Sequence, residues 1–139
     1  MLQEMIDLQA KLQSETYGKD ISKLDTCEKI EAYRINMMAL QDELHEALNE
    51  MSWKPWAKAE YFNDDRVQQE LVDAWHFFMN LMIISGMDAE KLHLRYLAKR
   101  KVNIKRQEDG YDGVSTKDEN GNATDEPTLD FEELRDEIK

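Results

Sequence analysis

Apolar residues recur three or four positions apart through most of the chain, which is the spacing of one face of an α-helix. The pattern covers residues 1–14, about 26–51, about 65–85 and about 88–106. No segment shows sustained alternation of apolar and polar residues, the pattern of a half-buried strand. Four such segments in one short chain predict an all-α fold with a four-helix bundle-like core.

Short polar residues mark where two of these helices begin. Asp25 or Thr26 is expected to cap the second helix. Asn63 or Asp64 is expected to cap the third. The second half of the third helix, residues 74–84, is almost entirely apolar. A helix that is apolar on most faces is buried on most faces, so we expect this stretch to lie in the core and to offer a dimerisation surface.

Charge is distributed unevenly along the chain, whose formal net charge is −12. Residues 107–139 carry 12 acidic and 3 basic side chains. This polar stretch is typical of a solvated tail, with a short amphipathic helix expected over residues 129–138. We therefore expect an all-α domain at residues 1–111 and an acidic C-terminal extension at residues 112–139.

The fourth predicted helix is basic. Residues 89–106 carry 7 basic side chains and a single acidic one. A basic helix beside acidic helices suits a small polyanion that is held through metal ions. It does not suit a nucleic acid, because the acidic remainder of the surface would repel the phosphate backbone. A solvated helix face explains the basic run equally well, so this feature alone does not decide the function.

The sequence predicts neither a membrane span nor a secretory leader. No apolar run reaches about 18 residues. The first residues lack the basic start and apolar stretch of a signal peptide. Cys27 is the single cysteine, so an internal disulfide is impossible. We expect a cytoplasmic protein that does not bind membranes.

Two pairs of acidic residues interrupt the apolar helical pattern. Glu43 and Glu46 are three positions apart in the second predicted helix. Glu70 and Asp73 have the same spacing in the third. Residues three apart share a helix face, so antiparallel packing of the two helices would bring four carboxylates together. Such a cluster repels itself without cations and offers the hard oxygen ligands that Mg²⁺ or Mn²⁺ prefers. In a chain with 30 acidic residues, solvated helix faces are the alternative.

Several stretches resemble the all-α nucleoside triphosphate pyrophosphohydrolases, a superfamily that includes MazG-like enzymes and the dimeric dUTPases. The acidic pairs, Glu-Leu-His-Glu and Glu-Leu-Val-Asp, resemble its ExxE…ExxD signature. Residues 52–56 (Ser-Trp-Lys-Pro-Trp), 73–80 and 96–111 resemble, in order and spacing, three stretches of the dimeric dUTPase branch. The resemblance covers residues from about 5 to 117 and implies the MazG or dimeric dUTPase type of fold.

The resemblance implies a role for each matching residue. It implies that Mg²⁺, or Mn²⁺, is bound by Glu43, Glu46, Glu70 and Asp73. It implies that phosphates or sugar are held by Asn80, Lys99, Asn103, Arg106 and Tyr111. It implies that the base is contacted or approached by Gln9, Gln13, Trp53, His76 and Phe77. The catalytic carboxylate, Glu46 or its neighbour Glu43, is expected to orient or deprotonate the attacking water.

The reaction expected from this resemblance is hydrolysis of a deoxynucleoside triphosphate to the monophosphate and pyrophosphate. dUTP is favoured by the resemblance alone, and dCTP or a purine (dGTP or dATP) is the alternative substrate. A non-catalytic helical adaptor is the alternative from another class of protein. We also expect a homodimer or homotetramer, because a bundle this small seldom forms a deep nucleotide pocket on its own.

Overall fold

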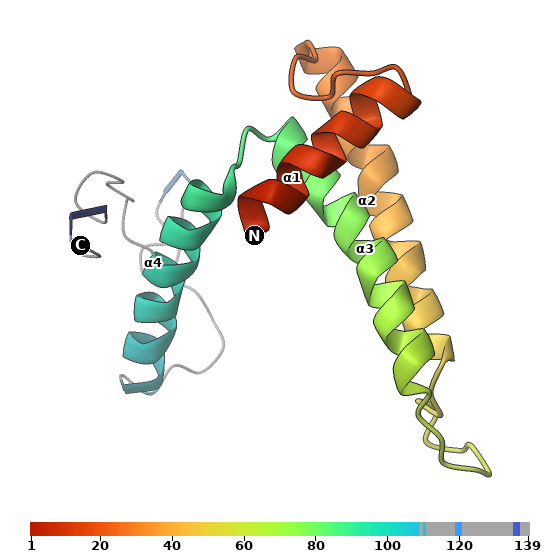
Figure 1. The fold of residues 1–139 in the computed structure, drawn as a ribbon. Coiled ribbons are helices and arrows are strands. Elements are labelled where there is room, and N and C mark those ends of the chain that lie inside the picture. The colour runs from red at the N-terminus through yellow and green to blue at the C-terminus, as the bar shows by residue number, and fades with distance from the viewer. Residues whose placement is uncertain (109, 111–118, 121–134, 137–139) are drawn as a thin grey trace. The chain divides into compact units, whose positions relative to one another are not determined.

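In the computed structural model the chain forms two compact units, Met1–Asp88 and Ala89–Lys139 (Figure 1). The structure describes residues 1–108, 110, 119–120 and 135–136. Within these residues there are four α-helices and no strand, which confirms the all-α prediction. The domain boundary expected after residue 111 falls among residues that are not described.

The first unit begins with α1 (Leu2–Lys11), which continues directly into the π-helical turn η1 (Leu12–Thr16). A π turn widens the helix locally and is often found at functional sites. Gly18 follows with a φ of 68°, a left-handed conformation that glycine adopts without strain. α1 packs against α3 and buries Ile6 together with a polar side chain, Gln9.

α2 (Thr26–Asn49) and α3 (Asp64–Ile84) lie side by side and run in opposite directions (Figure 1). The side chain of Asp25 accepts a hydrogen bond from the backbone N–H of Glu28, and the Glu28 carboxylate accepts one from the N–H of Asp25. This reciprocal capping box stabilises the start of α2 by about 1 kcal/mol. Asn63 caps α3 by accepting from the N–H of Arg66 at 3.4 Å. Both caps are among those predicted.

The core of this unit is built mainly from the second half of α3. Its buried side chains have exposed fractions of 2 to 8% and are Ala74, Met79, Asn80, Leu81, Met82, Ile83 and Ile84. The predicted burial of this stretch is therefore confirmed for these seven residues, whereas Phe78 remains 37% exposed. The expectation that this stretch offers a dimerisation surface stays a prediction.

α2 leaves much of its apolar surface uncovered. Ile30 and Met38 are each 65% exposed, and Leu44 is 48% exposed. Apolar side chains on α2 that do not face α3 have no other element of this unit to pack against. Uncovered apolar side chains therefore lie on α2, and α3 adds Leu71 and Val72, which are 48% and 56% exposed.

The two ends of the loop between α2 and α3 are joined by backbone hydrogen bonds. Met51 and Phe62 form an isolated antiparallel bridge, and the N–H of Ser52 donates to the carbonyl of Tyr61 at 2.9 Å. Trp53 lies within this loop, with the Lys54 ammonium 5.6 Å from its ring centroid. These hydrogen bonds hold the end of α2 close to the start of α3.

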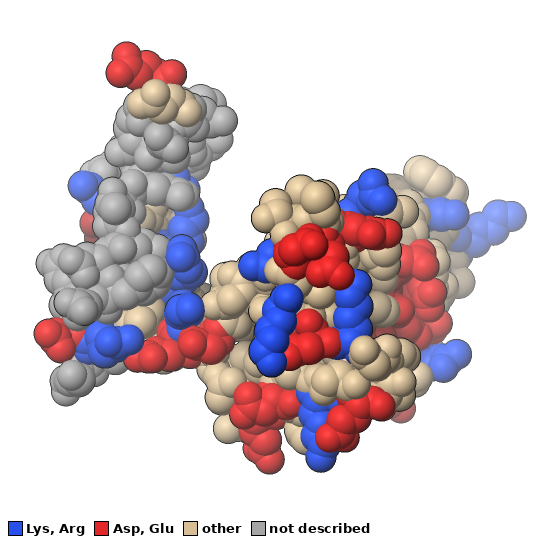
Figure 2. Space-filling model, turned by 90° about the horizontal axis from the view of Figure 1, so that it is seen from above, with Lys and Arg blue, Asp and Glu red and all other residues tan. Residues whose placement is uncertain are grey.

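The described part of the second unit consists mainly of α4 (Ala89–Glu108), which buries Leu94 and Ala98. Gly86, with a φ of 72°, ends α3 before it. Lys and Arg side chains are visible along the described part of this unit in Figure 2. The helix expected over residues 129–138 lies almost entirely outside the described residues. Among the helices that the structure describes, none is long and apolar enough to cross a membrane.

Candidate metal and nucleotide site

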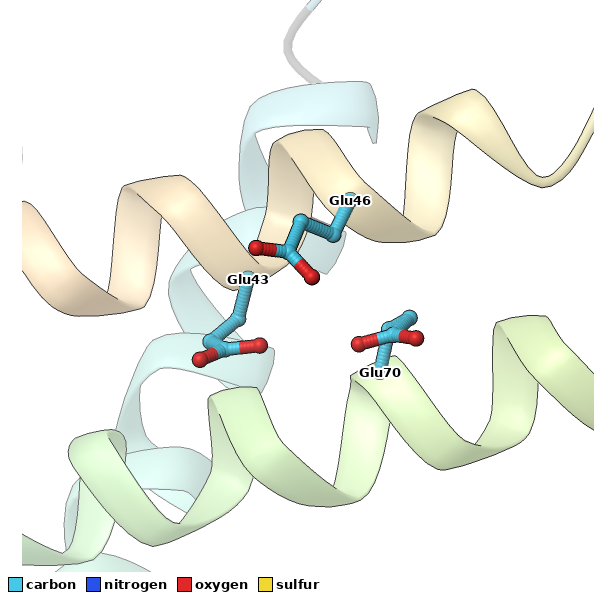
Figure 3. Close-up of side chains that lie close together, drawn as sticks. All are labelled: Glu43, Glu46 and Glu70. Atoms are coloured by element: carbon cyan, nitrogen blue, oxygen red, sulfur yellow. The ribbon is translucent and has the colours of Figure 1, made fainter.

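Three carboxylates meet between α2 and α3. Glu43, Glu46 and Glu70 each place one oxygen so that the three atoms all lie within 4.8 Å of one another. Figure 3 shows Glu43 and Glu46 on α2 and Glu70 on α3, with their carboxylates directed toward one another. The spacing of three residues puts the α2 pair on one helix face, and the packing of α3 supplies the third group. The structure thus brings together three of the four predicted metal ligands.

Asp73, the fourth predicted ligand, lies one helical turn after Glu70 on α3. None of its carboxylate oxygens falls within the tight cluster of the other three. Its charge nevertheless acts on Glu43, and the two residues line the same pocket. Asp73 therefore borders the carboxylate cluster on the side that faces the pocket.

The cluster is electrostatically incomplete. Burial raises the pKa of the Glu43 carboxyl above its ordinary value, and the charges of Glu46, Asp73 and Glu70 raise it further. Within the described residues, none of these carboxylates forms a hydrogen bond or an ion pair. Partly buried like charges are stabilised by a cation between them, and an all-oxygen donor set fits Mg²⁺ or Mn²⁺. The residues present therefore fit the divalent ion that the sequence predicts.

A pocket of about 430 Å³ adjoins this cluster, within the range of small-molecule sites. α1, η1, α2 and α3 all contribute to its wall. The lining residues are Gln9, Leu12, Gln13, Tyr17, Asn36, Glu43, Asp73, His76, Phe77 and Asn80. Four of the five predicted base-contacting residues are among them, as is Asn80, which was predicted to hold phosphate or sugar.

Buried amides form a hydrogen-bonded chain along one side of this pocket. Gln9 donates from Nε2 to Oδ1 of Asn80 at 2.8 Å. Asn80 donates from Nδ2 to Oδ1 of Asn36, and Asn36 donates from Nδ2 to the carbonyl of Ala32, each at 2.8 Å. At the other end, Nδ1 of His76 lies 2.7 Å from Oε1 of Gln9. We call these four side chains, Gln9, Asn36, His76 and Asn80, the amide relay.

Gln9 and Asn80 are almost completely buried, with exposed fractions of 3% and 4%. The oxygen and the nitrogen of each amide are bonded to protein atoms. A buried amide is stabilised when both its groups are paired, and here the pairing is made within the chain. In this structure the two amides therefore hold the pocket wall, while His76 is the exposed member of the relay.

Sequence reasoning missed Asn36. It precedes Glu43 by seven residues, so it lies on the same face of α2 as the carboxylates. A polar residue at that register within an apolar helical pattern was the available signal. Tyr17 and Leu12, which follow from the continuation of α1 into η1, had no comparable signal.

Other predicted residues lie elsewhere. Trp53 lines a separate hollow beside the α2–α3 loop, together with Asn49 and Tyr61. The predicted phosphate-binding residues Lys99, Asn103 and Arg106 are on α4 in the second unit. Tyr111 falls outside the described residues.

Comparisons with known proteins agree with this architecture. A family model described as dUTPase matches residues 1–86, which include the carboxylate cluster and the whole amide relay. The chain is 32% identical to the dCTP pyrophosphatase of Enterobacteria phage T4, over 79% of this chain and 82% of the relative. It is 37% identical to the dCTP pyrophosphatase of Enterobacteria phage LZ5, over 42% of this chain and 41% of that relative. No solved structure gives a significant match.

These matches settle the class of protein. The family model covers the helices that carry the acidic pairs, and both relatives are named dCTP pyrophosphatase. The alternative of a non-catalytic helical adaptor is therefore set aside. The chain belongs to the all-α dUTPase family and is a nucleoside triphosphate pyrophosphohydrolase.

Proposed function

We propose that the chain hydrolyses dCTP to dCMP and pyrophosphate in a Mg²⁺-dependent reaction. The observation that carries the metal dependence is the unneutralised cluster of Glu43, Glu46 and Glu70 beside a nucleoside-sized pocket. The choice of dCTP is supported by the two phage relatives named dCTP pyrophosphatase. dUTP is the second candidate substrate, because the sequence resemblance favours it and the matching family is described as dUTPase.

The carboxylates divide the chemistry between them. Glu46 and Glu70, with Glu43 and Asp73 beside them, would hold the divalent ion, which when bound would neutralise phosphate charge and lower the pKa of a bound water. One carboxylate of the α2 pair orients the attacking water and accepts its proton.

We assign binding of the substrate's phosphates to residues of α4. Lys99, Asn103 and Arg106 follow one another at intervals of four and three residues, so they share one face of the helix. Two cations and an amide on one face suit the developing charge of a pyrophosphate leaving group. The resemblance adds Tyr111 to this set, and Tyr111 lies outside the described residues.

A panel of deoxynucleoside triphosphates tests the function. Pyrophosphate release is measured for dCTP, dUTP, dTTP, dATP and dGTP, with Mg²⁺ and with EDTA. We expect the highest kcat/KM for dCTP and no turnover in EDTA. Absence of pyrophosphate release from all five would overturn the proposal, and a purine as best substrate would overturn the assignment of the base.

We also propose that the chain forms at least a homodimer through α2. The support is the apolar face of α2, on which Ile30, Met38 and Leu44 are 48 to 65% exposed. Exposed apolar surface of this kind is typical of an interface. Light scattering after size-exclusion chromatography should give at least twice the chain mass of 16.4 kDa. Met38→Glu should lower that mass, and a monomeric wild-type protein would contradict the proposal.

A further inference from the structure

α2 carries an apolar groove that the proposed chemistry does not use. The groove has a volume of about 510 Å³ and lies on the first half of α2, beside the end of α3. Its lining includes Ile30 and Met38, which are each 65% exposed. An exposed apolar surface of this size is typical of an interaction site. We call this hollow the α2 groove.

Side chains of α2 give the groove the shape of a hole in a coiled coil. The residues at i, i+3, i+4 and i+7 that line it are Ile30, Tyr33, Arg34 and Met37. Residues at this spacing are neighbours on one face of a helix. In a coiled coil, four residues of one helix form the hole into which one apolar side chain of the facing helix inserts. The α2 groove is therefore suited to the side chain of another helix.

The spacing of apolar residues on α2 indicates that the facing helix is a second copy of α2. Ile30, Met37 and Leu44 recur at intervals of seven residues. A seven-residue repeat keeps one side of a helix turned toward a partner helix. Among the described helices of the first unit, α2 packs against α3 alone, and Ile30 and Leu44 remain 65% and 48% exposed. A second α2 supplies the same repeat on its own surface.

The charge of Arg34 favours antiparallel pairing of the two helices. In a parallel pair each residue lies at the level of its own counterpart, so the Arg34 side chains of the two copies would lie side by side. Like charges beside a helix seam repel each other and help to set the orientation of the pair. In an antiparallel pair, Arg34 lies instead at the level of residues in the second half of the other α2.

Antiparallel pairing also fills both grooves. The hole is centred between residues 33 and 34, and Leu44 is an exposed residue of the repeat that lies outside the hole. If the two helices cross near residue 39, Leu44 of each copy lies opposite the hole of the other. A two-fold axis makes the two contacts identical and closes the dimer. Parallel pairing would face one hole with the other and leave both empty.

This pairing leaves the carboxylate cluster uncovered on α2. Met37 and Glu46 are nine residues apart, which is two and a half helical turns. The two side chains therefore lie on opposite sides of the helix. A second copy that packs on the side of Met37 does not cover Glu46.

We propose that two chains pair through α2 in antiparallel orientation, with the Leu44 side chain of each copy inserted into the α2 groove of the other. This inference rests on the proposed homodimer. It adds the direction of the two helices and the side chain that fills the groove.

Distances between spin labels test the direction of the helices without substrate. Labels are attached to one exposed position at a time, either the native Cys27 or Glu31→Cys and Asp42→Cys in a Cys27→Ser background. In an antiparallel pair, each residue away from the crossing adds about 3 Å to the separation along the helix axis, which is twice the rise per residue. Double electron–electron resonance should therefore give the longest distance at position 27 and the shortest at position 42. Nearly equal distances at all three positions, as in a parallel pair, would overturn the proposal.

Two exposed isoleucines of α2 form a matched pair that tests the groove. Ile30 and Ile35 are 65% and 56% exposed, but only Ile30 lines the groove. Ile30→Glu places a charge in the buried seam, so the dissociation constant of the dimer should rise at least about 10-fold. Ile35→Glu should leave the constant unchanged. An equal effect of the two substitutions in light scattering would overturn the role of the groove.

A double-mutant cycle tests whether Leu44 is the side chain that enters the groove. Substitutions of residues in contact have effects that are not independent. Leu44→Ala combined with Ile30→Ala should therefore weaken the dimer by less than the product of the two single effects. Leu44→Ala combined with Ile35→Ala should give that product. Independent effects in both combinations would overturn the contact of Leu44 with the groove.

The outcomes distinguish this inference from the proposals on which it rests. A dimer with equal label distances would overturn the antiparallel arrangement and leave the homodimer intact. A monomer in light scattering would overturn both. The panel of deoxynucleoside triphosphates decides the proposed reaction independently of either result.

Discussion

The two polar regions between the helices of the first unit are built on opposite principles. At the carboxylate cluster, Glu43, Glu46 and Glu70 each place an oxygen within 4.8 Å of the others, and none of them forms a hydrogen bond or an ion pair with the described residues. At the amide relay, every step from Ala32 to His76 is a hydrogen bond of 2.7 or 2.8 Å. The first region requires a ligand for its charge, and the second is already paired by the fold.

The difference teaches which parts of the site are rigid before substrate arrives. A paired, buried amide network holds its side chains in one arrangement, because any reorientation leaves a polar group unsatisfied. Crowded like charges have no such internal preference and are ordered by the ion they bind. We therefore expect the cluster to govern turnover and metal response, and the relay to govern stability.

The largest effect should come from the cluster. Glu46→Gln keeps the shape of the side chain but removes a ligand charge, so kcat/KM for dCTP should fall about 10²- to 10⁴-fold. Glu31→Gln, an exposed glutamate of the same helix outside the cluster, is the matched control and should retain activity. Helicity is followed by circular dichroism in both variants. Near-normal activity of a folded Glu46→Gln would remove this residue from the mechanism.

The second largest difference between the two regions should be in how Tm responds to added metal ions. An ion that binds only the folded cluster stabilises it by about 2.7 kcal/mol at 100 times its Kd, so Tm should rise with added Mg²⁺ or Mn²⁺. Glu70→Gln should abolish most of this rise. Asn80→Leu, in the relay, should retain it. A metal-induced rise in Tm that survives Glu70→Gln would place the ion at another site.

Stability should respond more to the relay than to the cluster. Asn80→Leu leaves the amides of Gln9 and Asn36 without their partner, so unfolding free energy should fall by about 1–3 kcal/mol. Glu46→Gln in EDTA should not lower it, because that substitution removes repulsion. Urea denaturation measures both. Equal destabilisation by the two variants would contradict the expectation that the relay stabilises the fold more than the cluster does.

The smallest effect concerns pH. The pKa of the Glu43 carboxyl is raised in the folded protein, first by burial and then by the charges of Glu46, Asp73 and Glu70. A raised pKa contributes stability that is present below the unfolded value and is lost as pH rises through the folded value. In EDTA, Glu43→Gln should therefore be stabilised relative to wild type at about pH 7 and not at about pH 4. A difference in Tm that does not grow with pH would contradict this origin of the shift.

The helices and their caps were predictable because they depend on local chemistry. Asp25 and Asn63 satisfy the amides of the turn that follows them, and the apolar run at 74–84 is buried whatever its partner. The spacing of Glu43 and Glu46 likewise places them on one face without knowledge of the fold. What packs against α1 is not a local property, so the partners of Gln9 could not be predicted.

Which residues line the site was easier to predict than which hydrogen bonds they make there. Gln9 and Asn80 line the pocket as the resemblance implies, but their burial and mutual hydrogen bond depend on the contact of α1 with α3. Asn36 reaches Asn80 only because α2 packs against α3, so its position on α2 alone did not predict this hydrogen bond. Long-range hydrogen bonds of this kind join residues 44 to 71 positions apart, beyond the reach of any periodic pattern.

Binding of Mn²⁺, which the same oxygen ligands hold, tests the central claim most directly. Free Mn²⁺ is measured by electron paramagnetic resonance as the ion is titrated into protein with a non-hydrolysable dCTP analogue, for wild type, Glu46→Gln and the control Glu31→Gln. We predict tight binding by the wild type and by Glu31→Gln, and binding at least about 10-fold weaker in Glu46→Gln. Equal affinity in Glu46→Gln and wild type would show that the carboxylates between α2 and α3 do not hold the metal.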